Sequence, residues 1–288
     1  MALEKCIDGA RAAASYADVG SLRGRMLAAL ESLGIRPSKK LGQNFLISEN
    51  AVDRLLAVAC VRDCDSVVEV GPGLGTISEK ILRIGARLFA IEIDGRFFNF
   101  LKEKFARCDN FQLQRGDAVE CPLGPLPREI ASFKVVANLP YGISSPWMAA
   151  LLGCENLPRS MALIVQEETA QRFFANRNPA DVCPISIFLQ SAYSLDAKCE
   201  IPRASFHPKP TVSSAIVAME RRDDAFIFKS PTKRTIVRIF TKRRKQIGTI
   251  LKGECEEATR WLEACEISRT LRPEEISIGQ WQRLNEFF

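Results

Sequence analysis

Histidine is nearly absent from this 288-residue sequence, which contains only His207, and its ten cysteines include no CxxC pair. Zinc sites are built mainly from closely spaced cysteine and histidine side chains, so these absences argue against a metal centre, and we expect none. The start of the chain also lacks a secretory signal pattern. This predicts that the scattered cysteines are reduced thiols rather than disulfides.

Long apolar runs are missing as well, because no stretch approaches the roughly 20 residues that span a bilayer. We therefore expect no membrane contact and interpret the chain as soluble and cytoplasmic. Separately, we expect it to be a monomer. Hydrophobic residues nevertheless make up 47% of the sequence, which is enough to bury a substantial core in one large domain with a small appendage. This composition argues against a mainly disordered chain.

The overall charge is modest, with a formal net charge of +6. This balance permits a polyanionic partner without requiring one. The distribution is more informative, because basic residues concentrate in Arg36, Lys39 and Lys40 and again between Lys233 and Lys245. Such runs form either solvated helix faces or a surface for nucleic-acid phosphates, and the charge pattern alone leaves both open.

The pattern of residues 21–222 predicts an α/β domain. Two helices, Leu22–Leu33 and one running from the N-cap Ser48 to Cys60, are followed by short β-rich runs that alternate with helical stretches. This alternation is typical of a Rossmann-like, doubly wound sheet with helices on both faces. We expect seven strands, the last two forming an edge hairpin: Ser66–Val70, Leu88–Ile91, Phe111–Leu113, Lys134–Ala137, Met161–Val165, Leu195–Ile201 and Ser214–Met219.

The two ends of the chain have different patterns. Residues 1–20 form an N-terminal extension to which we assign no role. Residues 223–288 are predicted to be a small all-helical domain, with helices at Thr232–Leu251, Glu256–Glu266 and Pro273–Leu284.

A nucleotide-cofactor site is indicated by the run Val67–Thr76, in which a buried strand leads through a glycine-rich turn into a helix. Gly71 and Gly73 let the backbone approach a ligand closely. Glu92 ends the second strand and can accept both hydroxyls of a ribose, and Asp117 after the third strand can accept from an adenine amine. A glycine turn followed by an acid fits either NAD or S-adenosylmethionine. The sequence Gly-Pro-Gly-Leu-Gly and the ordered acids favour S-adenosylmethionine.

The acidic residues also have simpler interpretations. Glu92 and Asp117 could cap the helices that follow them. Glu69 could either line the floor of the site or hold the turn.

The fourth strand ends in Asn138-Leu139-Pro140-Tyr141, a pattern that suits methylation of an exocyclic adenine amine. That amine is a poor nucleophile, because its lone pair is delocalised into the ring. The Asn138 side-chain oxygen and a backbone carbonyl beside Pro140 can each accept one N–H and so direct the lone pair at a methyl donor. Tyr141 can stack on an extruded adenine. Phe206 is the candidate for a second aromatic wall and Phe45 for a third, unless both are core aromatics.

Together these motifs resemble the small-subunit ribosomal RNA adenine N6,N6-dimethyltransferases, the KsgA (RsmA) family, from about Pro37 to Phe288. The segments that carry the resemblance are Lys40–Leu46, Glu69–Gly73, Glu92–Asp94, Gly116–Ala118, Asn138–Tyr141 and Phe206–Pro210. The resemblance implies a class I methyltransferase fold. It also implies N6,N6-dimethylation of two adjacent adenosines near the 3′ end of small-subunit rRNA, within the immature small ribosomal subunit, with S-adenosylmethionine as the cofactor.

The resemblance also assigns residues to roles. It implies that Asn44 and Leu46 touch the cofactor, that Gly71 cradles it, that Glu92 and Asp117 hold its ribose and adenine, and that Asn138 joins cofactor to target. The full expected cofactor set is Gln43, Asn44, Leu46, Gly71, Gly73, Glu92, Ile93, Asp117, Ala118 and Asn138. The expected catalytic set is Asn138, Leu139, Pro140, Tyr141 and Phe206, and the expected RNA contacts are Phe45, Lys242, Arg243, Arg244 and Lys245.

The same catalytic motifs are similar to those of the Erm enzymes, which methylate large-subunit rRNA. Two C-terminal segments, Phe240–Ile247 and Arg272–Trp281, resemble the KsgA family instead and favour an RNA-phosphate role for the basic run. One departure from that family is Asp181–Ser186, a loop expected to flank the target pocket.

Two further hypotheses belong to other functional classes. A ribosome assembly factor acting mainly by binding would not need the cofactor and Asn138 motifs. A dinucleotide oxidoreductase would need a hydride-handling residue, and none is evident.

Overall fold

The computed structural model describes residues 20–37, 42–175, 181–252 and 256–288. The predicted extension, apart from Gly20, and the residues Lys39, Lys40 and Leu41 lie outside this part of the chain. Contacts between residues group the chain into two units. The first runs to Glu167 and adds Leu195–Glu220, and the second joins Glu168–Ser194 to Arg221–Phe288.

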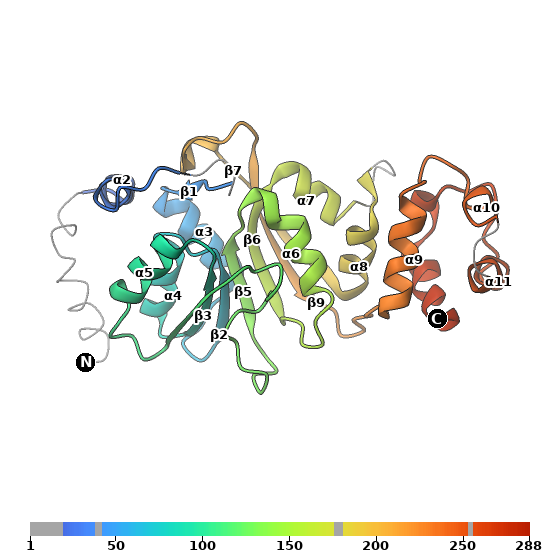
Figure 1. The fold of residues 1–288 in the computed structure, drawn as a ribbon, viewed down its shortest axis with the longest axis horizontal. Helices are drawn as coiled ribbons and strands as arrows, with labels where there is room; N and C mark the ends of the chain where they lie inside the picture. Colours follow the sequence, from blue (N-terminus) through green and yellow to red (C-terminus); the bar gives the residue numbers. More distant parts are fainter. Residues whose placement is uncertain (1–19, 38–41, 176–180, 253–255) are drawn as a thin grey trace. The chain divides into compact units, whose positions relative to one another are not determined.

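A seven-stranded sheet forms the centre of the fold, as predicted (Figure 1). Its order is β4-β3-β2-β5-β6-β9-β7. β2 pairs in parallel with both β3 and β5, and β6 pairs antiparallel with β9. The chain therefore reverses its direction of winding between β2 and β5, where the carboxyl ends of parallel strands open a crevice. The strands are β2 Ser66–Val70, β3 Arg87–Glu92, β4 Phe111–Arg115, β5 Lys134–Asn138, β6 Ser160–Gln166, β7 Tyr193–Ile201 and β9 Ser214–Arg221.

Both faces of the sheet are covered, which explains why its central strands read as continuous apolar runs. Every residue of β2 is buried, as are the five inner residues of β6. Parallel strands have this pattern where helices cover both faces. In the first unit these helices are α3 Glu49–Ala59, α4 Thr76–Ile84, α5 Gly95–Lys104 and α6 Ser144–Leu151.

The N-terminal helices begin where capping residues predict. Ser21 caps α2 (Leu22–Ser32), and the Ser48 hydroxyl accepts a hydrogen bond from the backbone N–H of Ala51 at the start of α3. α2 contributes Leu22, Met26 and Leu30 to the same core as Val52 and Leu55 of α3. After α2, the short strand β1 (Phe45–Leu46) pairs antiparallel with β8 (Phe206–His207). This pairing joins two motifs that are far apart in the sequence.

The second unit is helical, with a core built from aromatic side chains. Trp261 and Trp281 stack with ring centroids 4.9 Å apart, and the Trp261 indole N–H donates to the Gln280 carbonyl at 2.8 Å. Phe188 packs on Phe228 with ring centroids 5.3 Å apart. The helices of this unit include α8 Pro184–Ala192, α9 Ser230–Phe240, α10 Ile247–Ile250, α11 Glu256–Ala264 and α12 Ile278–Arg283, and α7 Glu167–Phe173 begins at its boundary.

The grouping of α8 with the C-terminal helices differs from the predicted division at residue 222. The backbone N–H of Arg222 donates to Ala192 and that of Phe226 to Ser191, each at 2.9 Å. These bonds tie the residues after β9 to the C-terminal end of α8. Contacts between residues that are far apart in the sequence therefore place α8 in the same unit as the C-terminal helices, although β7 and β9 lie between them in the chain.

The predicted helix Thr232–Leu251 is wrong as a single element. α9 ends at Phe240, Thr241–Gln246 form an exposed turn, and α10 begins at Ile247. Between Phe240 and Ile247 the sequence offers no apolar residue, so a continued helix would bury nothing there. The predicted helix Pro273–Leu284 is likewise a 3-10 turn, Pro273–Glu275, followed by α12. No helix in the described ranges is both long and apolar enough to cross a membrane.

Candidate functional site

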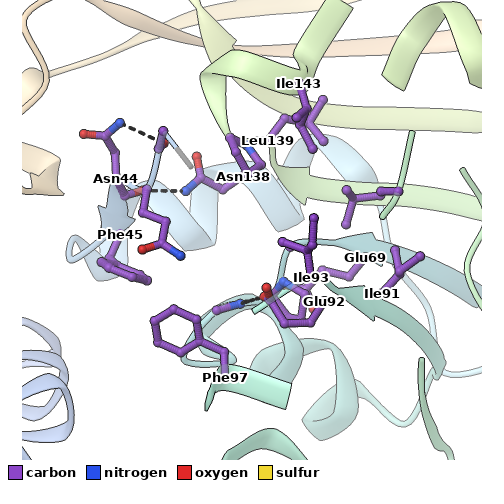
Figure 2. Close-up of a pocket in the computed structure, with 18 of the residues that line it drawn as sticks. Asn44, Phe45, Glu69, Ile91, Glu92, Ile93, Phe97, Asn138, Leu139 and Ile143 are labelled. Carbon is purple, nitrogen blue, oxygen red and sulfur yellow. Dashed lines mark hydrogen bonds between the residues drawn. The ribbon is translucent and has the colours of Figure 1, made fainter. Parts of the chain in front are cut away.

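A pocket opens in the first unit at the carboxyl ends of β2, β3 and β5 (Figure 2). Every residue of the expected cofactor set lines it, together with Phe45, Leu139, Pro140 and Tyr141. Met26 and Phe97 also line the pocket, although no motif in the sequence indicated them. Phe97 lies in the first turn of α5 and contacts Phe45 edge-on, with ring centroids 5.4 Å apart. The position of Phe97 shortly after Glu92, at the end of β3, is the feature of the sequence that could have indicated its place in the pocket.

The glycine turn forms one wall of the pocket. Gly71 and Gly73 both have positive φ, and the Gly71 N–H donates to the Ile91 carbonyl at 2.9 Å. A Cβ on Gly73 would lie 3.2 Å from the Phe45 ring, tighter than an ordinary contact. Glycine is therefore needed at Gly73 for both its backbone conformation and the space beside it.

Glu92 connects this turn to the end of β3. One carboxylate oxygen accepts from the Gly73 N–H at 3.0 Å, and the other accepts from the Asp94 N–H at 2.9 Å. Burial raises the pKa of Glu92 above its ordinary value, although both backbone hydrogen bonds oppose that shift. The helix-capping role is filled by Asp94, whose side chain accepts from Arg96 N–H at the start of α5. Glu92 is thus directed at the pocket.

Glu69 lies deeper in the same pocket and is 1% exposed. Its carboxyl accepts a hydrogen bond from the Ser78 hydroxyl of α4 at 2.6 Å, so Glu69 both lines the site and ties the helix to the sheet. Burial raises the pKa of Glu69 to about 8, with a smaller contribution from the neighbouring Glu92. Glu69 is therefore mostly protonated near neutral pH.

Replacing Glu69 with glutamine is expected to remove a pH-dependent loss of stability. Folded protein keeps a proton that the unfolded chain releases above pH 4.5, because the folded pKa is about 8. The wild-type protein should therefore lose stability relative to Glu69→Gln as pH rises through this window, at about 1.4 kcal/mol per pKa unit shifted. Urea unfolding of both proteins across this range measures the difference. Parallel stability profiles would contradict the assignment.

Asp117 follows β4 and forms the pocket's third acidic group. Its Oδ1 accepts from the Val119 N–H at 2.8 Å, and the Gly116 N–H donates to the Glu92 carbonyl at 3.1 Å. The neighbouring Ala118 is 6% exposed and lines the pocket, whereas Ile93 on the next strand end is 50% exposed. Glu69 lies within β2, Glu92 ends β3 and Asp117 follows β4, so the three acids come from three adjacent parallel strands.

Asn138, the last residue of β5, has an amide whose orientation is fixed. Its Nδ2 donates to the Asn44 carbonyl at 3.0 Å, and Asn44 in turn donates to the Gly42 carbonyl at 3.2 Å (Figure 2). A carbonyl can only accept, so the Asn138 nitrogen must face Asn44. The Asn138 Oδ1 is buried and has no hydrogen-bond partner within the described structure. Leaving a buried polar atom unpaired lowers the stability of the fold by about 1 to 3 kcal/mol. The Asn138 Oδ1 is therefore a candidate acceptor for a hydrogen bond from a ligand.

The backbone after Asn138 is held rigidly. The Leu139 N–H donates to Ile164 at 3.1 Å, and the Pro140 carbonyl accepts from the Ile143 N–H at 3.0 Å and the Ser144 hydroxyl at 3.3 Å. Because the Pro140 carbonyl already accepts two hydrogen bonds, the Leu139 carbonyl is the candidate backbone acceptor for a ligand. This refines the prediction of an acceptor beside Pro140.

The predicted aromatic residues have different positions. Tyr141 begins a 3-10 turn, Tyr141–Ile143, and lines the pocket. Phe45 also lines the pocket, packed against Phe97 beside the glycine turn. Phe206 is 2% exposed, belongs to the core that includes Leu46 and does not line the pocket, so the structure offers no ring face of Phe206 to a base. Its pairing with Leu46 in the β1–β8 ladder explains that burial.

The predicted RNA-contact residues Lys242, Arg243, Arg244 and Lys245 are all exposed. They form the turn between α9 and α10 in the second unit rather than a helix face. Arg243 donates to the Val182 carbonyl at 3.4 Å. This bond links the turn to the segment in which the sequence departs from the KsgA family.

The divergent segment Asp181–Ser186 leads into α8, which begins at Pro184. The Cys183 N–H donates to the Ser186 hydroxyl at 2.9 Å, and Pro184 occupies the first turn. These residues do not line the described pocket. No group of three or more histidine, cysteine, aspartate or glutamate side chains suited to a metal ion lies in the described ranges.

Comparison with solved structures supports the fold. A dimethyladenosine transferase from Plasmodium falciparum superposes with a TM-score of 0.66 at 22% identity, covering 82% of this chain and 94% of that one. The 23S rRNA methyltransferase ErmE superposes with a TM-score of 0.59, also at 22% identity, covering 85% and 99%. The predicted Rossmann-like class I methyltransferase fold is therefore confirmed.

Sequence comparison identifies the family. Ribosomal RNA small subunit methyltransferase A of Opitutus terrae is 40% identical over 262 residues, covering 88% of this chain and 94% of that protein. The protein of the same name from Pseudomonas putida is 32% identical over 255 residues, covering 86% and 94%. The family described as Ribosomal RNA adenine dimethylase matches residues 35–288. The predicted resemblance is thus confirmed, and the chain belongs to the ribosomal RNA adenine dimethylase family.

Proposed function

We propose that this enzyme uses S-adenosylmethionine to dimethylate the N6 amines of two adjacent adenosines near the 3′ end of small-subunit rRNA, in the immature small ribosomal subunit. The observation that carries the proposal is the buried, unpaired Asn138 Oδ1 in the pocket. The proposal predicts that an amine N–H of the target adenine pairs with this oxygen.

The charge of the pocket fits a cationic cofactor. Its described lining includes the acidic residues Glu92 and Asp117, besides the protonated Glu69, and contains neither lysine nor arginine. Such a lining attracts a sulfonium and an ammonium group, whereas it would repel the pyrophosphate of a dinucleotide. When bound, S-adenosylmethionine supplies a methyl group activated by the positive charge on sulfur. This argues against the dinucleotide alternative.

The acidic residues suit the cofactor's neutral parts as well. A carboxylate offers about four acceptor positions, so each Glu92 oxygen can take a ribose hydroxyl in addition to its backbone N–H. Asp117 uses Oδ1 for the Val119 N–H and has further capacity to accept from an adenine amine. Gly71 and Gly73 hold the turn against which the cofactor would lie.

Asn138 and Leu139 provide the chemistry at the target amine. In the first transfer the Asn138 Oδ1 and the Leu139 carbonyl would each accept one N–H, which makes the nitrogen pyramidal and localises its lone pair. In the second transfer the methylated amine has one N–H left, which one of these two acceptors would hold. Tyr141 supplies a ring on which the adenine stacks, and burial raises the pKa of Tyr141, so its hydroxyl stays neutral. No strong general base is needed, because the ammonium product can lose its proton to solvent. Orientation supplies most of the rate enhancement.

The acceptor RNA is proposed from the C-terminal unit and the relatives. The exposed turn Lys242–Lys245 offers four consecutive cations to phosphates. The relatives that are 32% and 40% identical are both named for the small ribosomal subunit. The likeness to ErmE, at 22% identity, reflects the shared fold and is not evidence that the acceptor is large-subunit rRNA.

The test is to incubate the protein with labelled S-adenosylmethionine and undermethylated small subunits, in parallel with large subunits, and to map the modified adenosines. We expect label in two adjacent adenosines of small-subunit rRNA, each carrying two methyl groups. Label confined to large-subunit rRNA would favour the Erm alternative. Absence of label from both RNAs would contradict the proposed activity.

A further inference from the structure

We propose that Ser214 is a positioning residue that fixes the plane of the Tyr141 ring for the target adenine. The inference rests on the proposed function and adds a residue that no sequence motif indicated. The Tyr141 hydroxyl and the Ser214 hydroxyl lie 2.5 Å apart, and Ser214 is completely buried.

The sheet register brings Ser214 to the site. Ser214 is the first residue of β9 and lies opposite Gln166 on β6, and Asn138 at the end of β5 lies opposite Ile164 on the same strand. Ser214 and Asn138 therefore lie at the same end of the sheet, at the carboxyl end of β6, which separates their two strands. The antiparallel β9 thus begins where the parallel strand β5 ends.

A tyrosine ring needs this second point of attachment to keep one orientation. The backbone at Tyr141 is fixed by its place at the start of the 3-10 turn, in which the Ile143 N–H donates to the Pro140 carbonyl at 3.0 Å. Backbone position leaves two side-chain torsions free, and ordering them costs entropy. A hydrogen bond at the phenolic oxygen fixes χ1 before the adenine arrives. Because a phenol hydroxyl prefers to bond in the plane of its ring, the same bond also limits rotation of the ring about χ2.

Ring orientation matters because stacking sets the plane of the target base. The Asn138 Oδ1 and the Leu139 carbonyl are fixed acceptors, so the amine reaches both only when the base lies in one plane. A ring that rotates would still contact the adenine but would present its amine correctly for a smaller fraction of the time. The loss should therefore appear in kcat more than in KM.

A simpler alternative is that the bond only satisfies two hydroxyl groups and stabilises the fold. Both interpretations predict lower stability when one partner is removed. They differ in the rate of methyl transfer by protein that remains folded. The test therefore compares kinetics in variants whose folding and cofactor affinity are checked separately.

The experiment measures single-turnover methyl transfer to undermethylated small subunits by the wild type, Ser214→Ala, Tyr141→Phe and the double variant. Tyr141→Phe keeps the ring for stacking and removes only the hydroxyl. We expect each single variant to lower the rate about five- to tenfold, as for loss of one neutral hydrogen bond, and the double variant to be no slower than either. Ser213→Ala, one residue earlier and outside the strand, is the matched control and should behave like the wild type.

Thermal unfolding and titration with S-adenosylmethionine establish that each variant is folded and binds its cofactor. If the Ser214→Ala protein does not fold, Tyr141→Phe alone decides the question. A wild-type rate in a folded Tyr141→Phe or Ser214→Ala protein, or losses that multiply in the double variant, would overturn the positioning role. Failure of the wild type to methylate any subunit would instead reject the proposed function, so the two failures are distinguishable.

Discussion

Replacing Asn138 with alanine is expected to lower methyl transfer by at least about 100-fold, the scale reported for loss of one preorganised polar group at a reacting centre. The substitution removes the buried Oδ1 that has no partner in the described structure. Because this oxygen is proposed to act on the target amine, affinity for S-adenosylmethionine should change much less than the rate. Transfer of a labelled methyl group to small subunits, together with calorimetric titration of the cofactor, measures both effects.

A second substitution at the same position separates the two ends of the amide. Asn138→Asp keeps an acceptor for the amine but loses the donor to the Asn44 carbonyl, so one carboxylate oxygen would face a carbonyl oxygen. We expect activity between that of the wild type and that of Asn138→Ala. Near-normal turnover by Asn138→Ala would reject the assignment of Asn138 to the chemistry.

Replacing Glu92 with glutamine is expected to weaken binding of S-adenosylmethionine by about 100-fold. The carboxylate accepts backbone N–H groups at both oxygens, from Gly73 and Asp94. An amide NH₂ at one of these positions would face another donor, so a backbone N–H and a ribose hydroxyl would both lose their acceptor. Leaving buried polar groups unpaired costs about 1 to 3 kcal/mol each, and two such losses give the expected factor.

The control for Glu92 uses the cofactor as well as the protein. A donor analogue that lacks the ribose hydroxyls should lose less affinity than S-adenosylmethionine when Glu92 is replaced. Equal losses for the two compounds would indicate that the substitution only distorts the glycine turn. Glu103→Gln, an exposed position on α5, should leave both affinities unchanged.

Local pattern was sufficient to predict most of the sheet and the cofactor pocket. Strand alternation, the glycine turn and the acids at successive strand ends are short-range signals whose spatial relationship follows from parallel winding. For the same reason Glu92 and Asp117 were predicted in the pocket where the structure has them.

Long-range packing determined the features that the sequence did not reveal. Phe206 lies in a motif that suggested a binding-site aromatic, but its pairing with Leu46 buries it. Ser214 approaches Tyr141 only because β9 inserts antiparallel beside β6. The break after Phe240 and the grouping of α8 with the C-terminal helices likewise depend on what each segment buries, which helical periodicity does not record.

The pairing of β1 with β8 has a consequence for the order in which the enzyme matures. β1 carries Phe45 and follows the Asn44 carbonyl that orients Asn138, yet its partner Phe206–His207 is synthesised long afterwards. Non-local pairings of this kind form late, because a long loop must close before any contact compensates its entropy. A nascent chain that has completed β5 therefore already contains the acids and Asn138 but lacks the strand that secures the wall of the pocket. Competence to modify RNA should arise late in synthesis, when β8 becomes available.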